Sequence, residues 1–144
     1  MSKTMSLGIV IGVRTSLDRV GRSALHYAAA HGDAAEVAGL LAAGLDPNLA
    51  DKNGFTPLHF AAQSWQPEIA AVLLTAGAEV EARNRYGNTV LAMAVLESRG
   101  RGELIELLRA AGADPHSVNR AGKTPVDIAR TIANYDVRQY FADI

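Results

Sequence analysis

Residues 53–62, NGFTPLHFAA, decide the fold of this chain because nearly the same phrase occurs four times. The other copies are VGRSALHYAA at 20–29, YGNTVLAMAV at 86–95 and AGKTPVDIAR at 121–130. A glycine marks the same place in each copy, at Gly21, Gly54, Gly87 and Gly122. A phrase that returns at a fixed period indicates a repeat array, in which each unit packs on its neighbours.

The period is 33 residues, with one longer unit. The marker glycines are spaced by 33, 33 and 35 residues. A second series, Gly44, Gly77 and Gly112, repeats at 33 and then 35 residues, so both series place two extra residues in the third unit. We therefore divide the chain into an N-terminal extension or lid, three full units and a shorter last unit that we expect to be a C-terminal cap. The boundaries are 1–17, 18–50, 51–83, 84–118 and 119–144.

Each unit contains the signals for a turn and two short helices. The opening pattern, Asp or Asn followed three residues later by Gly, is typical of a tight turn. Thr56 and Pro57 predict a helix start, because Thr caps free N–H groups and Pro suits the first helical position. We expect this helix to end near Ser64, a second helix to begin at Pro67, and Gly77 to terminate it.

These units resemble ankyrin repeats, whose signature TPLHxA is matched by TPLHFA at 56–61 and nearly by SALHYA at 23–28. The resemblance covers about 18–144 and implies an all-α repeat fold, an ankyrin solenoid of stacked helix-turn-helix pairs joined by β-turn fingers. Three departures lie within the repeated phrase itself: Val90 and Ala92 replace Pro and His in the third unit, and Asp127 replaces His in the fourth.

Composition restricts the function classes. The chain has 144 residues, 49% of them hydrophobic, a formal net charge of −1 and no cysteine. No thiolate chemistry or disulfide is available, and no net positive charge attracts nucleic acid or a membrane. The apolar stretch 7–13 is too short to span a bilayer and lacks the features of a signal peptide. We expect residues 6–17 to cover the open end of the stack as a strand or irregular lid, and the protein to be cytoplasmic.

No pattern indicates catalysis or metal binding. His26 and His59 belong to the repeated phrase, and their imidazoles are expected to bond the turn backbone of the next unit. His31 and His116 lie at a helix end and in a loop, and no histidine pair has metal-site spacing. Nucleophile elbows and phosphate-binding loops are absent from the sequence. We therefore expect a non-enzymatic protein without cofactor or metal.

The expected finger tips and neighbouring loops carry the candidate binding residues. Every tip holds Lys or Arg, which predicts a basic ridge and a protein partner with an acidic surface. Nucleic acid is a weaker candidate, because the chain as a whole is not basic. The candidate residues are Arg19, Arg22, Lys52, Asn53, Phe55, Trp65, Arg85, Tyr86, Asn88, Arg99, Arg101, Arg120 and Lys123.

Two of these features have alternative interpretations. Trp65 stands where ankyrins usually have Gly, and it either packs over the junction of a helix pair or waits for a partner. The loop SRGRG at 98–102 is either a mobile basic finger or a solvated insertion, which repeats tolerate at loops. The uncapped first unit also leaves monomer and weak dimer as alternatives.

A further resemblance concerns function. The run of DRxGRSALHYAA, DKNGFTPLHFAAQS, ESRGRGELIELLRAAGADP and TIANYDV is similar to small bacterial ankyrin proteins. Some of those proteins are encoded beside toxins and serve as immunity proteins. The resemblance implies a stoichiometric inhibitor that covers an acidic patch or the active-site mouth of a toxin, whereas a general scaffold with several partners is the alternative.

Overall fold

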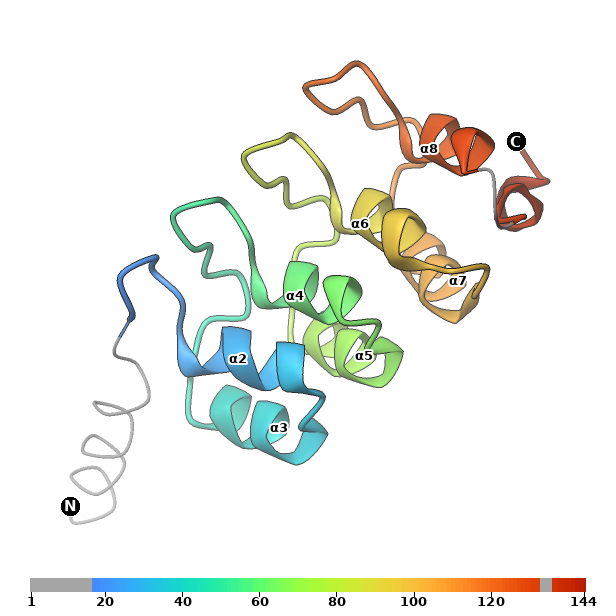
Figure 1. Ribbon diagram of the computed structural model, residues 1–144. Coiled ribbons are helices and arrows are strands. Elements are labelled where there is room, and N and C mark those ends of the chain that lie inside the picture. The colour runs from blue at the N-terminus through green and yellow to red at the C-terminus, as the bar shows by residue number, and fades with distance from the viewer. Residues whose placement is uncertain (1–16, 133–135) are drawn as a thin grey trace, which may run out of the picture.

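The computed structural model describes residues 17–132 and 136–144, and the predicted lid at 6–17 lies outside them except for Leu17. The chain forms a row of helix pairs, with long loops projecting to one side of the row (Figure 1). Within the described residues there are seven α-helices, one 3-10 helix and no strand. They are α2 (Ala24–His31), α3 (Ala34–Ala42), α4 (Pro57–Gln63), α5 (Pro67–Thr75), α6 (Val90–Glu97), α7 (Glu103–Ala110), α8 (Pro125–Thr131) and η1 (Arg138–Phe141).

The repeated phrase explains the first helix of each pair. In α4 the Thr56 hydroxyl accepts a hydrogen bond from the His59 N–H (3.3 Å), and the Thr56 N–H donates to His59 Nδ1 (3.2 Å). This reciprocal cap satisfies two backbone N–H groups that the first turn leaves free. In α8 Thr124 and Asp127 make the same pair of bonds, both at 3.0 Å. Asp127 therefore caps the start of α8 as His59 caps the start of α4.

The second helix of each pair ends at the predicted glycine. After α5 the cap is Ala76, and Gly77 takes a left-handed conformation with φ of 98°. The next N–H, that of Ala78, then bonds back to the Leu73 carbonyl (3.0 Å). This geometry satisfies a carbonyl that the helix end would leave free, and glycine adopts it without a Cβ penalty.

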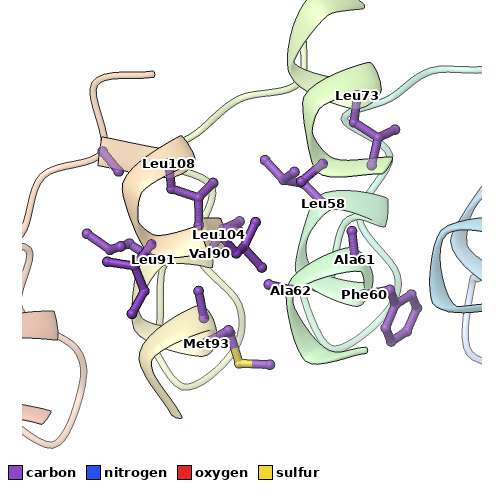
Figure 2. Packing of buried hydrophobic residues seen from close by; sticks show 14 of the residues in the cluster. Leu58, Phe60, Ala61, Ala62, Leu73, Val90, Leu91, Met93, Leu104 and Leu108 are labelled. Carbon is purple, nitrogen blue, oxygen red and sulfur yellow. The ribbon is translucent and has the colours of Figure 1, made fainter. Parts of the chain in front are cut away.

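The core is a single apolar layer shared by neighbouring pairs. Leu58 and Leu73 of one pair and Leu91 and Leu104 of the next are fully buried (Figure 2). Alanines with no exposed area, such as Ala61, let the helices approach closely. Because each side chain is covered mainly by an adjacent unit, no unit could bury its apolar face alone.

The last unit is shorter than the others, and η1 stands in place of a second helix. Arg109 on α7 holds it: the guanidinium donates to both Asp143 carboxylate oxygens (2.7 and 2.8 Å) and to the Tyr140 carbonyl (2.8 Å). The Tyr140 hydroxyl donates to the Gly100 carbonyl (3.0 Å), and the Tyr140 ring lies where a Cβ at Gly102 would be. The two-residue insertion in the third unit thus forms a seat for the C-terminal segment.

Candidate functional site: the finger surface

The candidate site is built on four fingers, the tight turns that open the units (Figure 1). In the second finger one Asp51 oxygen accepts the N–H groups of Asn53 (2.8 Å) and Phe55 (2.9 Å), while the Asp51 N–H donates to the Phe55 carbonyl (2.8 Å). The first residue of each other finger accepts the same two N–H groups, at Asp18, Asn84 and Asn119. The turns are therefore fixed by local bonds, independent of the tip side chains.

Consecutive fingers are also joined to one another. The N–H groups of Lys52, Arg85 and Arg120 donate to the carbonyls of Val20 (2.7 Å), Asn53 (2.8 Å) and Tyr86 (3.0 Å) of the preceding finger. The approach is close: a Cβ at Gly87 would lie 2.9 Å from the Arg120 nitrogen. Glycine is required there both by this distance and by its φ of 73°. The fingers form one row with a fixed spacing.

The two histidines of the repeated phrase connect helices to fingers, as predicted. His26 Nδ1 accepts the Ser23 N–H (2.9 Å), which leaves the proton on Nε2, and Nε2 donates to the Phe55 carbonyl of the next finger (2.9 Å). His59 bonds the Asn88 carbonyl in the same way (3.2 Å). Burial lowers the pKa of His26, and it lowers the pKa of His59 to about 4, because removal from water disfavours the charged imidazolium.

In the first two fingers much of the predicted basic surface is neutralised or engaged in packing. Arg22 forms an ion pair with the buried carboxylate of Asp51 (3.2 Å) and lies over the Phe60 ring (5.0 Å). Arg22 is thus not free of packing contacts, contrary to the expectation for a tip residue. Phe55 stacks on Phe60 (5.8 Å between ring centroids) and is half-buried. Arg19 and Lys52 are exposed.

In the third and fourth fingers the cations have no carboxylate beside them in the sequence, since neither 83–90 nor 117–126 contains Asp or Glu. Arg85 donates to the Asn53 side chain (3.0 Å) and lies over the ring of Tyr86, which is 56% exposed. Arg120 and Lys123 are exposed. Asn88 is half-buried and accepts a bond from Asn119 (2.8 Å).

The charge difference between the two halves comes from one position. The residue that opens each finger is Asp18 and Asp51 in the first two, but Asn84 and Asn119 in the last two. An Asn oxygen accepts the same turn N–H groups as an Asp oxygen but carries no charge. Asn84, Asn119 and the adjacent Arg83 were absent from the predicted site, although this change from Asp to Asn is visible in the sequence.

Comparison with known families agrees with this geometry. The chain matches the family described as ankyrin repeats (3 copies) over residues 7–84 and again over 25–119. It belongs to the ankyrin repeat family. Ankyrin repeats are in general non-catalytic scaffolds for protein–protein interaction, so the chain is a protein-binding module. A search of curated proteins returns no match.

The remaining predicted residues lie on the loops between the two helices of a unit, away from the finger turns. Trp65 is half-buried against the core of this ankyrin stack and has a left-handed backbone, with φ of 52°. Arg101 lies over its ring (4.4 Å) and donates to the carbonyls of Ser98 (2.8 Å) and Glu97 (3.1 Å) at the end of α6. Trp65 therefore packs in part against the core, and the Arg101 guanidinium is bonded to its own loop. Arg99 is exposed.

Two other observations bear on the function of this ankyrin protein. Among residues 17–132 and 136–144, no three His, Cys, Asp or Glu side chains gather in a way that would hold a metal ion. None of the helices described here is long and apolar enough to cross a membrane.

Proposed function

We propose that this protein binds the acidic surface of a single protein partner through its third and fourth fingers and inhibits that partner. The observation that carries the proposal is the cluster of Arg85, Arg120 and Lys123 on two fingers that contain no acidic residue. Exposed cations raise the rate of encounter with an acidic surface and favour one orientation of docking.

The geometry suits recognition without rearrangement. The fingers are bonded internally and to one another, and Arg85 is held between Asn53 and Tyr86. A surface whose side chains are already ordered loses less conformational entropy on binding. Tyr86 supplies the large exposed aromatic side chain that often anchors an interface.

The specific form that we propose is an immunity protein that acts in the cytoplasm by covering a cognate toxin. The resemblance to small bacterial ankyrin proteins supports this form. Because the fingers are rigid, the inhibitor would act in a one-to-one complex by blocking the toxin surface. A general scaffold is the second candidate, since the ankyrin fold alone does not select a partner.

The test is affinity capture of the tagged protein from lysate of its native cell, in parallel with the charge-reversed variant Arg85→Glu/Lys123→Glu. We expect one stoichiometric partner with an acidic surface in the first sample and its loss from the second. Purified partner should then associate with the variant about tenfold more slowly or worse, with a smaller change in dissociation, because exposed charges act mainly on encounter.

Four outcomes would contradict the proposal or its specific form. Several weak partners would favour the general scaffold. Capture that is equal with wild type and variant would remove the electrostatic role of the fingers. Retention on heparin or DNA that falls steeply with salt would assign the basic fingers to nucleic acid instead. A stoichiometric partner that is harmless when expressed without this protein would eliminate the immunity role.

A further inference from the structure

An open cleft of about 400 Å³ lies between the third and fourth fingers. Its lining residues are Arg83, Asn84, Gly87, Val118, Asn119 and Arg120. Two of these six residues are arginines and none is acidic, so the cleft combines a concave shape with an uncompensated positive charge. We propose that it is the seat of an acidic, extended segment of the partner protein, which places a carboxylate between Arg83 and Arg120. This inference rests on the proposed function and specifies where the acidic surface docks.

The first support is the fixed position of one guanidinium. Arg83 donates to the Val118 carbonyl (2.7 Å) and to the Ser117 hydroxyl, so it spans from the third finger to the base of the fourth. A guanidinium has several N–H donors, and these two bonds leave others for a ligand. A carboxylate would therefore meet a donor that is already oriented, which lowers the entropy cost of binding.

The second support is that the other guanidinium has no partner. Among the described residues, the Arg120 side chain makes no hydrogen bond or ion pair and is exposed. Its backbone is nevertheless fixed by the bond to the Tyr86 carbonyl (3.0 Å). Planar guanidinium groups bind carboxylates through paired, charge-assisted hydrogen bonds, which are stronger than bonds between neutral groups.

The third support is that the two fingers are bonded to each other beside the cleft and that no carboxylate among the described residues lines it. The Asn119 side chain donates to the Asn88 side chain (2.8 Å), which joins the two fingers beside the cleft. The nearest acidic residue before the third finger, Glu81, accepts a bond from the Asp114 N–H and is thereby held at the inter-repeat loop. The corresponding gap one unit earlier has Asp51 where this one has Asn84, and Ala50 where this one has Arg83. At the places of Val118 and Arg120 the earlier gap has Arg83 and Arg85, so the difference between the two gaps is the carboxylate of Asp51, which the later gap lacks.

The form of the cleft favours a peptide over a small ion. It is open along the fingers, and Val118 beside it is 51% exposed, so an extended segment gains apolar contact as well as charge pairing.

The test uses the full chain and two matched variants of the fourth finger. The probe is a synthetic hexaglutamate peptide, titrated at constant ionic strength while backbone amide NMR signals are recorded. We expect shifts concentrated at Gly87, Val118 and Arg120. Arg120→Gln should weaken the peptide about tenfold, whereas Lys123→Gln, which removes the same charge outside the cleft, should change the affinity less than about twofold.

The outcomes separate this inference from the proposed function. If both variants weaken the peptide equally, the fingers attract acidic segments through their overall charge and the cleft is not a specific seat, while the proposed function stands. If inorganic phosphate at equal concentration gives the same shifts, the commitment to a peptide carboxylate is overturned. If the peptide shifts no finger signal, both proposals are contradicted.

A further variant tests the other arginine of the cleft. Arg83→Gln should weaken peptide binding as much as Arg120→Gln does, and its NMR spectrum checks that the fold is kept.

Discussion

The histidine that joins α4 to the third finger should make the protein's stability fall in mild acid. His59 must be neutral in the folded state, because its Nδ1 accepts the Thr56 N–H and its ring is fully buried. Its pKa falls from 6.5 to about 4 on folding. Between these values the unfolded chain binds the proton and the folded chain does not, so the free energy of unfolding decreases as the pH falls.

The magnitude follows from the two pKa values. Lowering the pH from about 7.5 to about 5 should remove about 2 kcal/mol of stability through His59 alone. His26 has a lowered pKa for the same reason and adds to the loss. The carboxylates with lowered pKa values, such as Asp127, start from 3.8 and act in stronger acid. Urea denaturation followed by circular dichroism at several pH values measures the effect.

The decisive comparison is between His59→Ala and His116→Ala. His59→Ala should cost about 1–3 kcal/mol near neutral pH, because the Asn88 carbonyl and the helix cap lose a partner. When the pH is lowered from about 7.5 to about 5, this variant should lose about 2 kcal/mol less stability than the wild-type protein loses. His116→Ala is the control for the loss of an imidazole, because His116 is exposed on a loop and caps no helix. An unchanged slope in His59→Ala would refute the claim that this ring is held neutral by the fold.

Two further predictions concern the loops between helices. Trp65→Gly should be more stable than Trp65→Ala by about 1 kcal/mol, because only glycine takes the left-handed conformation freely; equal urea midpoints would show that this backbone is not strained. Gly102→Ala should lower stability by about 1–3 kcal/mol by displacing the Tyr140 ring, whereas Gly39→Ala, where a Cβ meets nothing within 4 Å, should be neutral or stabilising. In a Tyr140→Ala background the Gly102 effect should disappear, and its persistence would mean that the seat is not the cause.

The fold was predictable because each unit carries its own sequence signals for where helices start and end. Thr-Pro starts, glycine stops and the 33-residue period all point to the same elements, and the helix ends near Ser64 and before Gly77 were placed correctly. The family signature also predicted the bond from His59 to the next finger. The helix ends and this bond join residues at a fixed distance in the sequence, and a repeat period reveals that distance.

The site was predictable only in part, because pairing between tip side chains does not follow the period. Nothing in the repeated phrase shows that Arg22 is paired with Asp51 or that Arg101 covers Trp65. The docking of Tyr140 against Gly102 joins residues of different units at a non-repeating distance. The replacement of Asp by Asn at the third and fourth fingers was readable, but its importance emerges once the neighbouring cations are located in space.

The row of bonds between fingers has a consequence for how this protein can change. The bonds from one finger to the next run through backbone atoms of Lys52, Arg85 and Arg120, and the turns themselves are held by the Asp or Asn that opens each finger. Replacement of a tip side chain therefore changes the chemistry of the finger surface without moving the finger. If the tips bind the partner as proposed, mutations at these positions would retune partner choice at little cost to folding, and specificity and stability would evolve almost independently.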